Sequence, residues 1–145
     1  MTRLYLAGPL FCRAEREYNE QLRKEMAAAG YELLLPQDNS AAIDAARMPD
    51  PDYRRETAMR VFAADLELLS QADALLFNLD GRVPDEGACV ELGWASARKI
   101  PCFGLKTDVR TAEYGSDNLM IAGALAGRTA GSLTELIVLL RAAGL

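Results

Sequence analysis

Histidine is absent from this chain of 145 residues, and its absence narrows the chemistry that the chain can perform. A serine–histidine–carboxylate triad is excluded outright, because no imidazole is present to act as the base. The three cysteines, Cys12, Cys89 and Cys102, are widely spaced in apolar surroundings, which indicates reduced core thiols and argues against a zinc site. Catalysis would therefore depend on carboxylates, tyrosine, arginine, lysine or amides, and we expect no metal and no cofactor.

Long hydrophobic runs are also missing. The apolar stretches are far shorter than the ~20 residues that cross a bilayer, and the first residues pass directly into a strand and a turn, with no signal peptide visible. We therefore expect a cytoplasmic protein without membrane contact. The net charge of −5 argues against a nucleic-acid polymer as partner. The length fits one domain, which we expect to span residues 1–145.

Segments typical of strands and helices alternate along the chain. This alternation predicts an α/β fold with a doubly wound parallel sheet of four to five strands and flanking helices, joined by right-handed crossovers. Ligands bind such sheets beyond the carboxyl ends of the strands. We therefore expect Gly8, after the first strand, and Asp38, after the second, to contact substrate. The expected strands are 3–7, 31–35, 73–79, 100–105 and a weak 128–130, and the expected helices are 15–29, 52–71, 87–97, 118–126 and 132–143.

Glu91 is the one charged residue between Gly87 and Ala97. Its neighbours make the predicted helix apolar nearly all round, and such helices are buried. A buried carboxylate is costly unless it is paired, protonated or used in chemistry. Glu91 is thus the first functional candidate. The alternative is a glutamate near a helix end that reaches solvent or an arginine.

Two further acids and a tyrosine join this candidate site. Asp65 falls within the predicted buried stripe of the helix at 52–71, beside Phe62, where it is either functional or a structural tie to a neighbouring loop. Asp85 precedes Glu91 by roughly 9 Å of helical rise, so one acid could act on a sugar carbon while the other protonates the leaving group. We prefer Asp85 to Asp65 as that acid, because it lies in the turn beside the Glu91 helix. Tyr5 either orients the glutamate by a hydrogen bond or serves as core.

Taken together, these residues resemble the nucleoside 2-deoxyribosyltransferase family. The resemblance covers nearly the whole chain and implies a flavodoxin-like fold. It also implies that the 2-deoxyribosyl group of a 2′-deoxynucleoside passes to a free purine or pyrimidine base. The route would be a retaining double displacement through a covalent glutamyl intermediate. The segments that carry the resemblance are YLAGPLF at 5–11, DL at 65–66, DG at 80–81, PDEG at 84–87, ELG at 91–93, TDVR at 107–110 and NLM at 118–120.

The resemblance also assigns roles to individual side chains. It implies that Glu91 is the nucleophile, that Tyr5 holds it, and that Asp65 and Asp85 contact the base. An aromatic ring beside the base falls on Phe11. These are largely the residues that composition and patterning had already marked as unusual.

Two other family elements concern assembly and base contact. The resemblance implies that Asn118 and Met120 reach into the site of a neighbouring subunit, so we expect a homo-oligomer acting on 2′-deoxynucleosides and nucleobases. The segment has no evident core role in its own subunit. The family's base-contacting glutamine has its nearest counterpart at Gln37 or Ser40.

Two other functions remain open at this point. Related N-glycosidases that hydrolyse (deoxy)nucleoside 5′-monophosphates share the fold and the glutamate. A phosphate would require arginine or serine donors in the first loop, and Arg13 and Arg16 lie just past it. A non-catalytic nucleotide sensor is the third possibility, and it would not need an isolated nucleophile.

Overall fold

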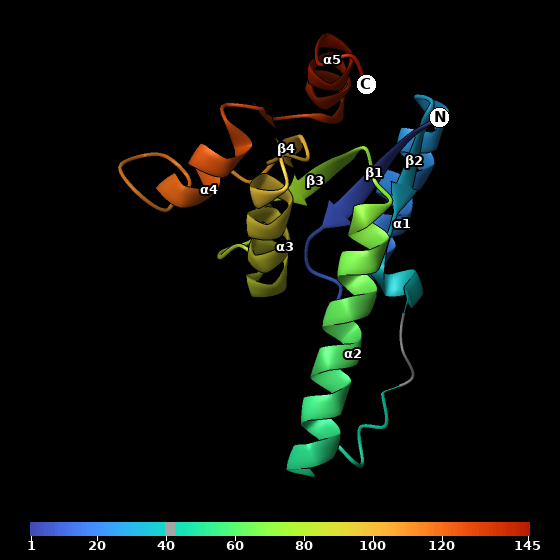
Figure 1. The fold of residues 1–145 in the computed structure, drawn as a ribbon. Helices are drawn as coiled ribbons and strands as arrows, with labels where there is room; N and C mark the ends of the chain where they lie inside the picture. The colour runs from blue at the N-terminus through green and yellow to red at the C-terminus, as the bar shows by residue number, and fades with distance from the viewer. Residues whose placement is uncertain (40–42) are drawn as a thin grey trace.

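The computed structural model describes residues 1–39 and 43–145, which form an α/β fold around an all-parallel sheet (Figure 1). The strands are ordered β2-β1-β3-β4-β5, which confirms the predicted doubly wound sheet with five strands. This order is the flavodoxin-like one. The strands are β1 (Thr2–Ala7), β2 (Tyr31–Leu34), β3 (Ala74–Asn78), β4 (Cys102–Leu105) and β5 (Thr129–Ala130), and the helices are α1 (Arg13–Ala28), α2 (Pro51–Ser70), α3 (Glu86–Ala97), α4 (Leu119–Leu125) and α5 (Leu133–Ala142), with a 3₁₀ turn η1 (Pro36–Asn39).

Alternation along the buried strands decides which helix each side chain meets. Leu4 and Leu6 of β1 point to the face covered by α1 and α5. Tyr5 and Ala7 point to the opposite face, which α2, α3 and α4 cover. Tyr5 is fully buried there. Its position in the strand therefore places its hydroxyl on the side of the sheet where α3 carries Glu91.

The two helices that border β3 are less buried than the sequence predicts. In α3 the buried residues are Ala88, Leu92 and Ala95, while Val90 is 55% exposed, so the prediction of a helix buried all round is wrong. In α2 Phe62 is 54% exposed, although it lies in the C-terminal half of this helix, and the N-terminal part of α2 extends beyond the sheet (Figure 1). An apolar sequence pattern reports which faces can be buried, but the sheet covers only the part of a helix that lies against it.

The carboxyl edge of the sheet is held together by close packing and by one carboxylate. A Cβ atom on Gly8 would lie 2.8 Å from Cβ of Asn78, so glycine lets the end of β1 approach the end of β3. Asp80 accepts hydrogen bonds from the backbone N–H groups of Thr107 at 2.6 Å and Asp108 at 2.8 Å, which joins the loops after β3 and β4. Among the described helices, none is long and apolar enough to cross a membrane.

Candidate active site

A hydrogen bond between β1 and α3 lies at the centre of the candidate site. The hydroxyl of Tyr5 donates to Oε1 of Glu91 at 2.7 Å, across 86 positions of sequence. Side chains alternate between the two faces of the sheet along β1, and Tyr5 points to the face that α3 covers. Because α3 begins at Glu86, Glu91 comes within reach of the Tyr5 hydroxyl. The suggestion that Tyr5 orients Glu91 is therefore matched by a direct contact, and the alternative that Glu91 reaches an arginine is not what the structure shows.

The surroundings of Glu91 favour its protonated form. Burial is the main cause that raises the pKa of Glu91 from 4.5 to about 7, and the negative charges of Asp65 and Asp85 raise it further. The hydrogen bond from Tyr5 acts in the opposite direction, because it stabilises the carboxylate. Burial, followed by the charge and hydrogen bond of Glu91 and the charge of Asp65, raises the pKa of Tyr5, so its hydroxyl remains a donor at neutral pH. Glu91 is thus a poorly hydrated carboxylate that ionises near neutrality, a state suited to a nucleophile.

Asp65 and Asp85 reach the neighbourhood of Glu91 from two directions. Asp65 is on α2, and its half-buried position raises its pKa. Asp85 is the N-cap of α3, where its Oδ2 accepts a hydrogen bond from the backbone N–H of Ala88 at 2.8 Å. Asp85 therefore has a structural duty that the sequence did not reveal. Its Oδ1 has no hydrogen bond within the described part of the chain, and that oxygen can face a substrate.

A cavity of about 490 Å³ opens at the carboxyl edge of the sheet, between the loops that follow β1 and β3. We call it the edge cavity, and its lining residues are Pro9, Phe11, Glu15 and Asp80 to Gly87. Phe11 is 73% exposed, so its ring is available to a flat ligand. The position of this cavity agrees with the rule that ligands bind beyond the carboxyl ends of parallel strands.

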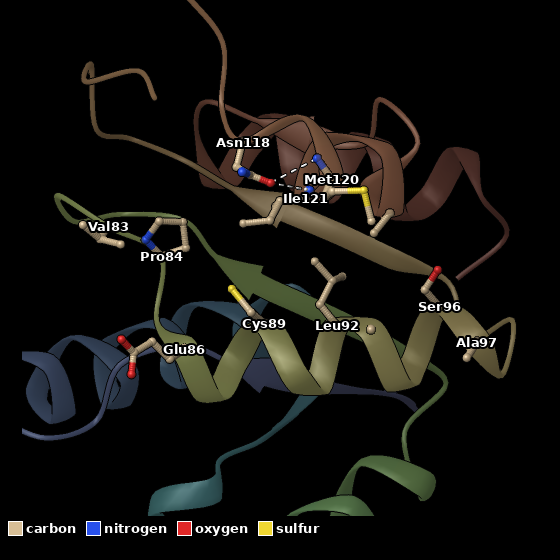
Figure 2. Close-up of a pocket in the computed structure, with 12 residues that line it drawn as sticks. Val83, Pro84, Glu86, Cys89, Leu92, Ser96, Ala97, Asn118, Met120 and Ile121 are labelled. Atoms are coloured by element: carbon tan, nitrogen blue, oxygen red, sulfur yellow. Dashed lines mark hydrogen bonds between the residues drawn. The ribbon is translucent and has the colours of Figure 1, made fainter. Parts of the chain in front are cut away.

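A second, larger cavity of about 780 Å³ lies between α3 and α4 (Figure 2). Cys89 and Leu92 of α3 point into it, facing Ile121 of α4. Glu91 does not line it, because two residues along a helix correspond to roughly 200° of rotation. The chemistry of the chain and its larger hollow are therefore on different faces of α3. Asn118 and Met120 also line this hollow.

The family model for nucleoside 2-deoxyribosyltransferases matches residues 4–127, which include all the strands except β5 and all the acids described above. The chain belongs to the nucleoside 2-deoxyribosyltransferase family. A search of curated protein sequences finds no match.

Solved structures support the fold. A conserved protein from Enterococcus faecalis V583 is 27% identical, with a TM-score of 0.76 over 99% of each chain. A 2-desoxiribosyltransferase from Leishmania mexicana is 21% identical, with a TM-score of 0.72 over 100% of each chain. A CMP N-glycosidase from Clostridium botulinum is 18% identical, with a TM-score of 0.56 over 98% of this chain and 99% of that one. The same architecture thus accompanies transferases and an N-glycosidase.

The residues that the deoxyribosyltransferase family implies for a neighbouring site lie away from Glu91. The side chain of Asn118 caps α4 by accepting from the backbone N–H groups of Met120 at 3.0 Å and Ile121 at 3.3 Å, and it donates to Glu113. Asn118 therefore caps a helix of its own subunit, although it is only partly buried and lies outside the core. Met120 is 83% exposed and has little contact with its own chain.

The loop after β2 is engaged in internal contacts. The amide of Gln37 accepts from Asn19 at 3.0 Å and donates to Glu20 at 2.9 Å, so both ends of this side chain are occupied. Asp38 forms an ion pair with Arg23 and lines a separate hollow on the β2 side of the molecule. The structure does not bring Asp38 together with the Glu91 cluster. Ser40, the other counterpart of the family glutamine, lies outside the described residues.

Sequence reasoning missed Glu15 as a residue of the edge cavity. Its carboxylate accepts hydrogen bonds from the backbone N–H groups of Phe11 at 2.7 Å and Cys12 at 2.8 Å. In a capping box, a glutamate three residues after the N-cap bonds back to the N-cap backbone. Cys12 and Glu15 have this spacing at the start of α1. The signal was present in the sequence, but cysteine in the capping position obscured it.

Proposed function

We propose that this chain transfers the 2-deoxyribosyl group of a 2′-deoxynucleoside to a free purine or pyrimidine base. The observation that carries the proposal is the partly buried Tyr5–Glu91 hydrogen bond, with Asp65 and Asp85 close enough to perturb the pKa of Glu91. This is a nucleophile held by an orienting donor, beside acids that can handle a leaving group. The membership of the family supports the same reaction.

In the first step an oxygen of Glu91 attacks the anomeric carbon of the bound nucleoside. The bond from that carbon to the base nitrogen breaks, and its electron pair leaves with the base. The departing nitrogen needs a proton or a strong hydrogen bond. Asp65 suits proton donation, because burial raises its pKa, and Asp85 suits a hydrogen bond through Oδ1. The product of this step is an ester between Glu91 and the sugar.

In the second step a nitrogen of the incoming base attacks the same carbon, and the ester bond breaks to regenerate the Glu91 carboxylate. The proton that this nitrogen loses returns to the aspartate that protonated the departing base. Two inversions leave the configuration of the sugar unchanged. During both steps the Tyr5 hydroxyl keeps Glu91 in one orientation, and the buried surroundings limit access of water to the ester.

We further infer that the active form is a homo-oligomer in which Asn118 and Met120 complete the site of a neighbouring subunit. Exposed apolar side chains on α3 and α4 support this inference, since Val90, Leu119 and Met120 are each more than half exposed. The cavity between the same two helices offers further apolar surface for a partner copy.

A base-exchange assay tests the proposed reaction. Several 2′-deoxynucleoside donors are incubated with a second free base, and both the new nucleoside and the liberated sugar are measured. We expect the new nucleoside to be the main product, and we expect Glu91→Gln to fold and bind but not to turn over. Glu56→Gln, an exposed position on α2, is the matched control and should retain activity. Sugar release that ignores the concentration of acceptor would instead support an N-glycosidase, and ligand binding without any turnover would support a sensor.

A further inference from the structure

Two helices begin at the edge cavity, and the N-terminus of each already carries a carboxylate of the chain itself. The backbone N–H groups at a helix N-terminus form a favourable site for a phosphate. At α1 the Glu15 carboxylate accepts from Phe11 and Cys12, and at α3 the Asp85 carboxylate accepts from Ala88. Three of the backbone donors at these two helix N-termini, those of Phe11, Cys12 and Ala88, are therefore engaged by carboxylates of the chain before any ligand arrives.

Glu15 is a strong internal anion. Its two short backbone hydrogen bonds are the main reason that its pKa lies below the usual value for a glutamate, so it is ionised throughout the neutral range. Its carboxylate lines the edge cavity beside Phe11, which is where a ligand would enter from the β1 side. A phosphate that approached the N-terminus of α1 would meet this negative charge instead of open N–H donors.

The arginines next to the first loop lie outside the edge cavity, although the charge of Arg16 contributes to the lowered pKa of Glu15. The guanidinium of Arg16 donates to the carbonyl oxygens of Leu10 at 3.0 Å and Phe11 at 2.9 Å, which fastens the loop to α1. Arg13 is bonded to Glu17 on the exposed side of the helix at 2.6 Å. Neither residue lines the edge cavity. The suggestion from sequence that these two arginines serve a phosphate is therefore not supported by where their side chains lie.

Negative side chains outnumber positive ones in the lining of the edge cavity. It contains four carboxylates, those of Glu15, Asp80, Asp85 and Glu86, and one guanidinium, that of Arg82. Arg82 is exposed, in the loop that also carries Asp80. A neutral nucleoside can enter such a cavity without penalty, whereas a phosphate of nearly two negative charges is repelled.

We propose that Glu15 is a specificity-determining residue that excludes 5′-phosphorylated donors by filling the anion site at the N-terminus of α1 with its own carboxylate. This inference rests on the proposed nucleoside chemistry, with the edge cavity, which Asp85 also lines, as the place where the donor is bound. A unit charge roughly 7 Å from a phosphate dianion lowers its binding about fivefold in a water-like dielectric, and by more where the cavity walls exclude water. Removing the charge of Glu15 should restore a factor of this size.

The experiment compares the best nucleoside donor with its 5′-monophosphate and uses the ratio of their kcat/KM values. In Glu15→Gln, kcat/KM for the monophosphate divided by kcat/KM for the nucleoside should rise about fivefold or more, because glutamine keeps an oxygen for the backbone donors but has no charge. Glu17→Gln, one half-turn along α1 and outside the cavity, is the matched control and should leave the ratio within about twofold of wild type. Raising the salt concentration should raise the ratio in wild type more than in Glu15→Gln.

Binding measurements keep this test separate from the test of the reaction. Both compounds are titrated into Glu91→Gln and into the Glu91→Gln, Glu15→Gln double variant, so the affinity ratio is obtained without turnover. If no donor is turned over by wild type, the proposed reaction fails, while the affinity ratio still decides the role of Glu15. If Glu15→Gln does not fold, the salt dependence in wild type decides it instead.

Three outcomes would overturn the role of Glu15. One is a ratio that does not change in Glu15→Gln, or that changes equally in Glu17→Gln. Another is a wild-type enzyme that uses or binds the monophosphate as well as the nucleoside at low salt. The third concerns an Arg82→Gln variant. If its monophosphate-to-nucleoside ratio of kcat/KM falls by a larger factor than the ratio rises in Glu15→Gln, Arg82 holds the phosphate.

Discussion

Replacing Glu91 by glutamine should stabilise the fold at alkaline pH while removing activity. Glutamine has nearly the same shape and can still accept the hydrogen bond from Tyr5, so the main physical change is the loss of a buried negative charge. The structure holds the pKa of Glu91 at about 7, against 4.5 for an ordinary glutamate, chiefly through burial. A site that raises the pKa of an acid favours its neutral form, and the ionised form then lowers the stability of the native state.

The magnitude follows from this difference in pKa. Each pKa unit corresponds to 1.36 kcal/mol, so the change from 4.5 to about 7 corresponds to about 3 kcal/mol. Below pH 4.5 Glu91 is protonated in both the native and the unfolded chain, so its ionisation does not lower the free energy of unfolding. Between pH 4.5 and about 7 the unfolded chain loses this proton first, so the native state is destabilised progressively as the pH rises. Above that window the full cost is present in wild type and absent from Glu91→Gln.

Chemical denaturation at a series of pH values measures the effect. The free energy of unfolding of Glu91→Gln should match that of wild type near pH 4 and exceed it by about 3 kcal/mol at pH 8. Glu56→Gln should follow wild type throughout, because this residue is exposed on α2 and its side chain is not taken out of water on folding. A difference between Glu91→Gln and wild type that is the same at every pH would refute the assignment of a buried, high-pKa carboxyl to Glu91.

Three further predictions concern turnover. Tyr5→Phe should raise the pKa of Glu91, move the rising limb of the pH–rate profile to higher pH and lower kcat about ten- to hundredfold, because a hydrogen bond to a charged group is lost. Asp65→Asn and Asp85→Asn should slow transfer from donors with poor leaving groups more than from activated donors, by up to about 10²-fold, and asparagine should preserve the cap of α3 at position 85. Met120→Ala should weaken the oligomer in sedimentation and lower kcat/KM at low protein concentration, since Met120 is exposed in the single chain.

Each of these predictions has a control within the chain. Tyr31→Phe removes a hydroxyl that bonds Leu145 on the opposite face of the sheet, and it should leave the pH profile unchanged. An equal loss for activated and poor leaving groups in the two aspartate variants would argue against a leaving-group role. A monomer that is fully active at the concentration of the assay would contradict the shared site, whatever the effect of Met120→Ala.

A comparison of 2′-deoxyadenosine with adenosine as donors is a further check on the reaction. The pocket around a buried Glu91 should disfavour the added hydroxyl by about 10²-fold, which is what a site without a partner for that hydroxyl can achieve. The inductive effect of the hydroxyl on the oxocarbenium-like transition state acts in the same direction. Equal rates for the two donors would point away from a deoxyribosyltransferase.

The sequence by itself determined the architecture and the identity of the central acids. Strand and helix periods, with glycine and proline at the boundaries, are local signals, so the order of elements could be read residue by residue. Glu91 stood out because a single charge in an apolar segment is visible without coordinates. The bounds of the elements and the five-stranded parallel sheet agree with that reading.

Only the tertiary structure decided which groups meet and which are already engaged. The Tyr5–Glu91 contact depends on the parity of β1 and the docking of α3, which are long-range features. The exposure of Phe62 and Val90 depends on which side of each helix packs against the rest of the fold. Glu15 and Arg16 are adjacent in sequence, yet their side chains have different places in the structure. Arg16 donates to the carbonyl oxygens of Leu10 and Phe11, whereas Glu15 lines the edge cavity. Residue type limits the chemistry that a side chain can perform, but the packing of distant segments decides where that side chain can act.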